Sequence, residues 1–271
     1  MEVVFYNGTF TNKDNASISS DSRSFNYGDG FFETVKIVNE RLFNFSSHME
    51  RIKLALTILK LDNNYTKKFL QEIIYELITV NKMVNGTIKI HFSRSGSGRY
   101  LPESNSSDIF IRTINGELYK KNNKISLCFY EEECKSKGSL SNIKSVNSLV
   151  SVLASVYANK NGFDNAILFN FLGNIIESAN ANIFIVKDKK IYTPPISEGC
   201  IDGTMRRWVL NNFDVSEKVI LKNEILQSDE IFITNATSGV IAVENLEEVS
   251  FSSFNKADLI QQKLINLSLG L

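Results

Sequence analysis

The sequence predicts an α/β or α+β chain of two domains. Short strand and helix patterns interleave along all 271 residues, which is typical of mixed sheets covered by helices. Hydrophobic residues make up 43% of the chain, so a sizeable core can form. The polar stretch "NGELYKKNNK" at 115–124 is the best linker, and it separates a small N-terminal domain (1–114) from a larger C-terminal domain (125–271).

The N-terminal domain begins with hairpin patterns. In "VVFYNGTF", Asn7-Gly8 forms the turn, and "FFETVKIVNERLFNF" predicts two strands joined at "NE". "SSHMERIKLALTILKL" predicts a helix with a capping box from Ser47 to Glu50, and "TKKFLQEIIYELITVNK" predicts a second helix. "GTIKIHFSR" and "DIFIRTI" predict paired strands around a Gly/Ser-rich loop.

The C-terminal domain starts with the strand pattern "ISLCFY". "SNIKSVNSLVSVLASVYANKNG" then predicts one amphipathic helix over residues 141–162. Its apolar residues at helical spacing are Leu149, Val152, Leu153, Val156 and Tyr157. "NAILFN" and "GNIIES" follow as further short segments, "NIFIVKDKKIYTPP" predicts a hairpin with a charged turn, and another helix follows Gly203.

The charge balance gives no sign of an anionic partner. Lys and Arg together number 30, as do Asp and Glu, which argues against nucleic acid or an anionic membrane. No apolar run approaches the roughly 18 residues of a membrane span, and "MEVVFYNG" lacks signal-peptide features. Cys128, Cys134 and Cys200 form no CxxC motif and are interpreted as reduced thiols. We therefore expect a cytoplasmic protein.

The chain has only two histidines, His48 and His91, which restricts the possible chemistry. A His-rich metal site is excluded, and no metal is expected. His91 lies in the strand pattern "TIKIHFS", and a structural role is expected for both residues. Proton transfer therefore depends on Lys, Glu, Asp or Tyr.

Lys144 falls in the first turn of the predicted helix. The N-terminal end of a helix carries a partial positive charge, which disfavours an ammonium group. Apolar neighbours Ile143 and Val146 would favour the neutral amine further by partial burial. A lysine that is neutral part of the time can form a Schiff base with a carbonyl. The alternative is an ordinary solvated lysine.

Glu177 follows a Gly-Asn turn and two isoleucines in "GNIIESANANIFIV". Its carboxylate is expected to be at least half buried, so it needs a cationic or proton-donating partner. The alternative is an edge-strand glutamate that faces water.

Several segments could bind anions. "GCIDGTMRRWVL" and "ITNATSGVIAV" each place small residues at a turn, and the first leads into a helix N-terminus, where backbone N–H groups face an anion. Arg51 lies early in a helix, and Arg94 and Arg99 flank a Ser/Gly loop where guanidinium groups could grip a carboxylate. Solvated arginines and a mobile loop tip are the alternatives. An amine, a carboxylate and anion-binding turns together match pyridoxal phosphate.

The sequence resembles the class IV aminotransferases, the fold-type IV pyridoxal-phosphate enzymes. The resemblance rests on eight segments in the family's order: "FNYGDGFFETVKI", "HMERIKLAL", "SRSGSGR", "IKSVN", "NIIESANANIFIV", "IYTPP", "GCIDGTMR" and "ITNATSGVIAV". It implies a two-domain fold with the cofactor at the domain interface. It also implies a homodimer in which a loop of one subunit closes over the cofactor of the other.

The resemblance implies a role for each matching residue. Lys144 would bind the cofactor covalently and then shuttle a proton, Glu177 would face the pyridine nitrogen, and Arg51 would reach the phosphate. Further cofactor contacts are implied for Ile201, Gly203, Thr204, Met205, Asn235 and Ala236. Substrate contacts are expected at Phe32, Arg94 and Arg99.

Departures from the family pattern favour one branch. Leu149 stands where branched-chain aminotransferases usually have tyrosine, Phe32 where D-amino-acid aminotransferases have tyrosine, and Met205 where a hydroxyl residue is common. "SRSGSGR" and the Met205 turn look most similar to the aminodeoxychorismate lyases of folate biosynthesis, which convert 4-amino-4-deoxychorismate to 4-aminobenzoate and pyruvate. The alternative is a branched-chain or D-amino-acid aminotransferase, and a third is a non-catalytic protein that keeps the scaffold for binding.

Overall fold

The computed structural model describes residues 2–271 and divides the chain into two compact units. Unit 1 comprises the chain up to Leu118 together with a short segment, Ile143–Asn147. Unit 2 comprises Tyr119–Asn142 and Ser148–Leu271. We call Ile143–Asn147 the lysine segment, because Lys144 lies in it.

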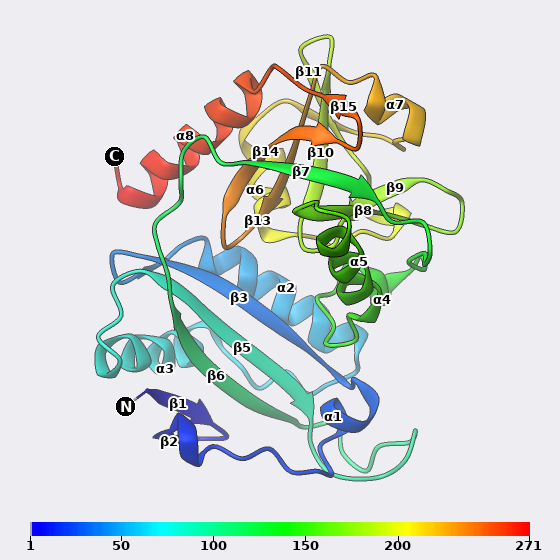
Figure 1. Ribbon diagram of the computed structural model, residues 1–271. Helices are drawn as coiled ribbons and strands as arrows, with labels where there is room; N and C mark the ends of the chain where they lie inside the picture. Colours follow the sequence, from blue (N-terminus) through cyan, green and yellow to red (C-terminus); the bar gives the residue numbers. More distant parts are fainter. Residues whose placement is uncertain (1) are drawn as a thin grey trace. The chain divides into compact units, whose positions relative to one another are not determined.

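Unit 1 is a six-stranded antiparallel sheet in the order β2-β1-β6-β5-β3-β4. The helices α2 and α3 pack on one face of this sheet (Figure 1). The elements of unit 1 are β1 (Val3–Tyr6), β2 (Thr9–Asn12), the 3-10 helix η1 (Lys13–Asn15), α1 (Arg23–Tyr27), β3 (Gly30–Val38), β4 (Arg41–Leu42), α2 (Phe45–Ile58), α3 (Lys67–Val80), β5 (Gly86–Arg94) and β6 (Ser107–Asn115).

Alternation along the strands builds the core of unit 1. Phe31, Val35 and Ile37 of β3 point to the helix-covered face and are buried, as the period of two in a strand requires. The predicted Asn7-Gly8 turn is confirmed, since both residues have positive φ and Tyr6 pairs with Thr9. The predicted capping box is wrong, because α2 already begins at Phe45.

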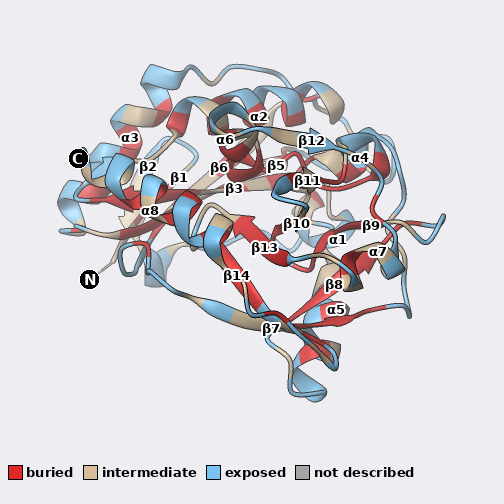
Figure 2. Ribbon diagram, turned by 90° about the horizontal axis from the view of Figure 1, so that it is seen from above, coloured by how far each residue is buried: buried red, intermediate tan, exposed pale blue. Residues whose placement is uncertain are grey.

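Unit 2 is built on a nine-stranded mixed sheet in the order β12-β11-β10-β13-β14-β7-β8-β9, with β15 paired to β14. Its central strands β13 and β14 are mostly buried (Figure 2). The elements of unit 2 are β7 (Lys124–Phe129), α4 (Ser139–Asn142), α5 (Leu149–Lys160), β8 (Asn165–Phe169), β9 (Ile175–Ser178), β10 (Asn182–Lys187), β11 (Lys190–Thr193), the 3-10 helix η2 (Ile196–Glu198), α6 (Thr204–Asn212), β12 (Val215–Glu217), α7 (Lys222–Leu226), β13 (Glu230–Asn235), β14 (Gly239–Leu246), β15 (Val249–Ser250) and α8 (Asn255–Leu269).

The lysine segment pairs with the outer edge of β3. The N–H of Phe32 donates to the carbonyl of Lys144 (3.0 Å), and the N–H of Val146 donates to the carbonyl of Gly30 (3.2 Å). The short strand β4 covers only the far end of β3, so this part of the edge offers unpaired backbone groups to the segment. The predicted boundary, which assigned Lys144 to residues 125–271, therefore differs from the structural division.

The single helix predicted over 141–162 is wrong in its first third. The structure forms α4, then the extended lysine segment, and only then α5. Lys144 is therefore not in the first turn of a helix. The apolar stripe of α5 is also mostly solvent-exposed within unit 2, where only Ala154 and Ala158 of the helix are buried.

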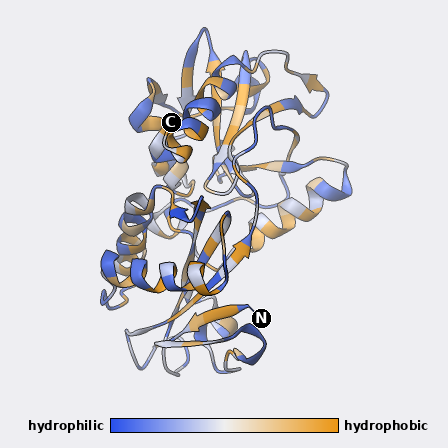
Figure 3. Cartoon of the chain, turned by 90° about the vertical axis from the view of Figure 1, so that its left-hand side faces the viewer, coloured by the Kyte–Doolittle hydropathy of each residue, from blue (hydrophilic) through white to orange (hydrophobic). Residues whose placement is uncertain are grey.

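Hydrophobic residues are concentrated in the strands of both units, while the helices alternate between hydrophobic and hydrophilic faces (Figure 3). Among residues 2–271, no helix is long and apolar enough to cross a membrane. The described residues contain no group of three or more His, Cys, Asp or Glu placed to hold a metal ion. Cys128, Cys134 and Cys200 are free thiols.

Candidate active site

Lys144 is held against an aromatic ring in unit 1. Its Nζ lies 4.8 Å from the centroid of the Phe32 ring, and the Nζ of Lys89 lies 4.6 Å from the same centroid. The ring face attracts both ammonium groups. Because the backbone of Lys144 is bonded to that of Phe32 in β3, the sheet fixes where this amine projects.

A buried ion cluster lies on the helix-facing side of β3. Glu33 accepts two hydrogen bonds from Arg51 (Nε to Oε1 and Nη2 to Oε2, both 2.7 Å), and the Nδ1 of His48 lies 2.6 Å from Oε2. Glu33 occupies an inward position of its strand, and His48 and Arg51 share one face of α2. All three side chains are at least nine-tenths buried.

Opposing effects set the protonation states in this cluster. Burial alone would raise the pKa of Glu33, but the positive charge and hydrogen bonds of Arg51, assisted by His48, lower that pKa to about 2. Burial lowers the pKa of His48, and the charges of Arg51 and Lys144 lower it further. The charge and hydrogen bond of Glu33 raise this pKa but do not outweigh the other effects. Arg51, predicted to contact a phosphate, donates from Nε and Nη2 to Glu33.

Arg94, expected to contact substrate, is instead built into the protein. Its Nε donates to Asp29 (2.9 Å), and its Nη1 and Nη2 groups donate to Asn105 and to the carbonyl of Leu59. The guanidinium is buried and these bonds hold the loop between β5 and β6. Arg99 lies exposed in that loop, and its substrate contact stays a prediction.

Glu177 is buried in β9 of unit 2, only 3% exposed. The pairing with β8 shifts register at this point: Leu168 pairs with Glu177, but Phe169 pairs with Ile175. An extra residue of this kind is a β-bulge, which re-aims the neighbouring side chain. The Oε1 of Glu177 forms an ion pair with the Nζ of Lys135, and Oε2 accepts the N–H of Ile201 (2.9 Å).

The segment before α6 packs closely against β10. The Nδ2 of Asn182 donates to the carbonyl of Ile201 (2.8 Å), and a Cβ at Gly203 would lie 1.9 Å from the Asn182 Oδ1. A residue larger than glycine at this position would force the Asn182 side chain to shift. α6 begins at Thr204, with Met205 in its first turn, and backbone N–H groups at a helix start of this kind face outward along the helix axis, the geometry that suits an anion.

The turn between β13 and β14 lies next to this helix start, because Asn182 pairs with Thr234. The Oδ1 of Asn235 accepts the N–H groups of Thr237 and Ser238, and the carbonyl of Ala236 accepts the hydroxyl of Tyr119. Among the described residues, the buried hydroxyl of Thr234 has no hydrogen-bond partner. An unpaired donor beside a helix N-terminus fits an oxygen-rich anionic ligand.

The residues present fit pyridoxal phosphate. Lys144 supplies an amine, and Glu177 supplies a buried carboxylate with one hydrogen bond at each oxygen, which leaves acceptor sites for a ring N–H. The helix start and the unpaired Thr234 hydroxyl suit a phosphate. Sequence reasoning missed Glu33 and Lys135, although the inward position of Glu33 in "FFETVKI" was a readable signal.

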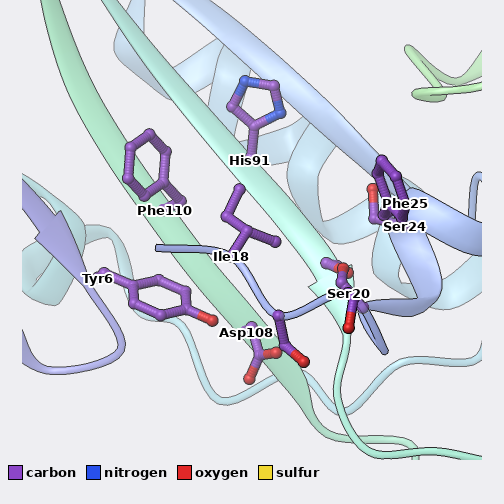
Figure 4. A pocket seen from close by; sticks show the side chains of 11 residues that line it. Tyr6, Ile18, Ser20, Ser24, Phe25, His91, Asp108 and Phe110 are labelled. Carbon is purple, nitrogen blue, oxygen red and sulfur yellow. The ribbon is translucent and has the colours of Figure 1, made fainter. Parts of the chain in front are cut away.

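A separate pocket of about 630 Å³ lies in unit 1 (Figure 4). Strands β1, β5 and β6 and the segment 18–25 line it, with Tyr6, His91, Asp108 and Phe110 among its residues. It contains none of the predicted site residues, so it gives no support to the cofactor assignment.

The family that the chain matches makes it a pyridoxal-phosphate enzyme. The family described as amino-transferase class IV matches residues 30–246, and the chain belongs to it. The predicted family, fold class and cofactor are thereby confirmed.

Three similar proteins are informative. The chain is 27% identical to the D-alanine aminotransferase of Staphylococcus haemolyticus over 261 residues, covering 91% of this chain and 90% of that one. A branched-chain aminotransferase structure from Thermoproteus uzoniensis matches with a TM-score of 0.92 at 23% identity, covering 99% of this chain and 95% of that one. A structure from Legionella pneumophila, named as a 4-amino-4-deoxychorismate lyase, matches with a TM-score of 0.86 at 25% identity, covering 94% and 97%.

Proposed function

We propose that this protein is an aminotransferase that moves the amino group of a small amino acid to a 2-oxo acid, with D-alanine as the first candidate donor. The observation that carries the proposal is the match to D-alanine aminotransferases over 91% of the chain. The lyase favoured by the sequence has weaker support, because that activity is named for a structural neighbour at 25% identity.

In this proposal Lys144 holds the cofactor through its amine and afterwards moves a proton from the substrate carbon that bears the amino group. Bound pyridoxal phosphate supplies a carbonyl for amines and a ring that accepts electrons. The pairing of the lysine segment with β3 supports the role, since it keeps the amine at a fixed point against Phe32. Correct placement of a proton-transfer group is the first requirement for such catalysis.

The remaining cofactor contacts come from four places. Glu177 holds the ring nitrogen in its protonated form, and Arg51 with the first turn of α6 binds the phosphate. The hydroxyl of Thr234 and the turn at Asn235 complete the phosphate site. The burial of Glu177, its bond from the N–H of Ile201 and the unpartnered hydroxyl of Thr234 support these assignments.

A lyase of the aminodeoxychorismate type is the second candidate. It is favoured by Phe32, whose ring stacks near His91 and offers no hydroxyl to anchor a carboxylate. A flat, partly apolar substrate ring suits such a surface better than a small polar amino acid does.

Purified protein loaded with pyridoxal phosphate tests both candidates. Pyruvate formation from D-alanine and 2-oxoglutarate, measured beside L-amino acids and beside 4-amino-4-deoxychorismate, separates the two activities. The aminotransferase proposal expects turnover of an amino acid and no 4-aminobenzoate. Production of 4-aminobenzoate without any amino-acid turnover would reverse the assignment.

We also propose that a second copy of this chain covers the exposed stripe on α5. Leu149 is 70% exposed and Val156 is 60% exposed, and no charged residue occurs in the helix before Lys160. A neutral apolar stripe with small residues between can pack on its own copy without like-charge repulsion, as a two-fold interface requires. Sedimentation of the wild type and of Val156→Glu tests this: a dimer is expected for the first and a shift to monomer for the second.

A further inference from the structure

Lys135 is attached to the strand next to Glu177. Its N–H donates to the carbonyl of Phe169 (2.9 Å), and it forms a parallel bridge with Asn170 just beyond the end of β8. Leu168 of β8 pairs with Glu177 of β9, so a residue attached at Phe169 lies close to Glu177. This attachment therefore places the side chain of Lys135 beside the carboxylate. The position of the ammonium is therefore set by backbone pairing.

The ion pair is largely removed from water. The side chain of Lys135 is 16% exposed and that of Glu177 is 4% exposed. The ammonium binds one carboxylate oxygen while the N–H of Ile201 binds the other, so the carboxylate is held at two points. A charged pair in such surroundings has a specific geometry and interacts strongly.

Other charged groups near this pair have their own partners. Burial raises the pKa of the Cys200 thiol to about 12, and the carboxylate of Glu177 contributes, so this thiol stays neutral. Asp202 pairs with Arg207, and Arg206 pairs with Glu217. Lys135 is thus the cation that balances Glu177.

We propose that Lys135 is a positioning residue that acts through Glu177 to keep the proton on the ring nitrogen of the bound cofactor. This inference rests on the proposed use of pyridoxal phosphate. It assigns to Lys135 an electrostatic role that a merely structural lysine would not have.

The physical reason is the location of one shared proton. A carboxylate and a ring nitrogen that share a proton can hold it on either atom. A cation bonded to the carboxylate stabilises the negative charge of that carboxylate. It destabilises the positive charge of a protonated ring nitrogen on the far side of the carboxylate by a smaller amount, because Coulomb energy falls with distance. Lys135 therefore favours an ionised Glu177 and a protonated ring, the form that accepts electrons from the substrate.

The same segment offers a matched control. Lys137, two residues on, forms an ion pair with Glu198 (2.8 Å), which also accepts the side-chain amides of Asn170 and Asn174. That carboxylate holds the turn between β8 and β9 and has no assigned cofactor contact. Lys137→Met removes an ammonium of the same kind from the same segment.

The experiment compares wild type, Lys135→Met, Lys135→Arg and Lys137→Met, each loaded with cofactor labelled with ¹⁵N in the ring. The ¹⁵N chemical shift reports ring protonation without any turnover. We expect the protonated-ring shift in wild type, Lys135→Arg and Lys137→Met, and movement toward the unprotonated value in Lys135→Met. Exchange of the substrate proton next to the amino group should slow on the order of tenfold in Lys135→Met alone.

Other results would decide against the idea. An unchanged ¹⁵N shift in Lys135→Met, or an equal change in Lys137→Met, overturns the role of Lys135 while leaving the proposed function intact. Failure of the wild type to bind the cofactor at all overturns the proposed function instead. Should Lys135→Met not fold, Lys135→Gln replaces it, with the same two outcomes read from its ¹⁵N shift.

Discussion

Replacing Glu33 with Gln is expected to destabilise unit 1 strongly. The change keeps the size of the side chain but leaves Arg51, 5% exposed, without its counter-charge. Removing one partner of a buried ion pair costs about 3–5 kcal/mol. The pKa of Glu33 gives a similar figure, because a fall from 4.5 to about 2 corresponds to about 3 kcal/mol in favour of the charged form.

Thermal unfolding of cofactor-free protein, followed by circular dichroism, measures the effect. At roughly 2–4 °C per kcal/mol for a chain of this size, Tm should fall by roughly 6–20 °C at neutral pH. The matched control is Lys13→Met, which breaks the exposed pair with Glu2 and should change stability by less than about 1 kcal/mol.

The pH dependence gives an independent check with a definite sign. Because the folded-state pKa of Glu33 lies below its unfolded value, its contribution is fully present above pH 4.5 and is lost as the pH falls toward about 2. The Tm gap between wild type and Glu33→Gln should therefore narrow over that window. A gap below about 2 °C at neutral pH, or one that does not narrow in acid, would refute the reasoning.

Three further predictions concern other parts of the chain. Lys144→Ala should abolish turnover while the far-ultraviolet circular dichroism stays unchanged, and retained turnover would exclude the lysine assignment. Gly203→Ala should weaken cofactor binding on the order of tenfold, measured by titration, because its Cβ would lie 1.9 Å from Asn182; unchanged affinity would contradict the phosphate site. Burial and neighbouring positive charges lower the pKa of His91 to about 4. The stabilisation that neutral His91 gives above pH 6.5 should therefore be lost as the pH is lowered toward 4, which reduces the free energy of unfolding by roughly 1–2 kcal/mol. Denaturant unfolding should show that His91→Phe loses less of its free energy of unfolding over this pH range than the wild type does.

Features specified by neighbouring residues could be predicted from the sequence. Asn7-Gly8 closes its hairpin because both residues tolerate positive φ, a property that depends on no distant contact. The burial of Glu177 followed from its place between isoleucines and an apolar strand, and so did its need for a partner. The combination of amine, carboxylate and anion-binding turns also pointed to the cofactor, because each of these features is visible in a short stretch of neighbouring residues.

Features created by distant pairing could not be predicted in this way. The lysine segment takes its hydrogen bonds from β3, more than 100 positions earlier, and these bonds replace the helical turn that local spacing favoured. Arg94 is buried because Asp29, Leu59 and Asn105 converge on it from elsewhere in the chain. Helical periodicity in α5 was correctly recognised, but periodicity alone does not say whether an apolar face meets the core, a partner or water.

The two buried carboxylates show why one can serve a ligand and the other cannot. Glu33 accepts two bonds from Arg51 and lies against His48, so its charge is neutralised within a closed cluster. Glu177 has one bond to each oxygen, from Lys135 and from the N–H of Ile201. A carboxylate offers about four acceptor sites, so about two remain on Glu177. A buried carboxylate that is balanced in charge and still has acceptor capacity is ready to bind an N–H donor from outside the chain, and a ring nitrogen that carries a proton is such a donor.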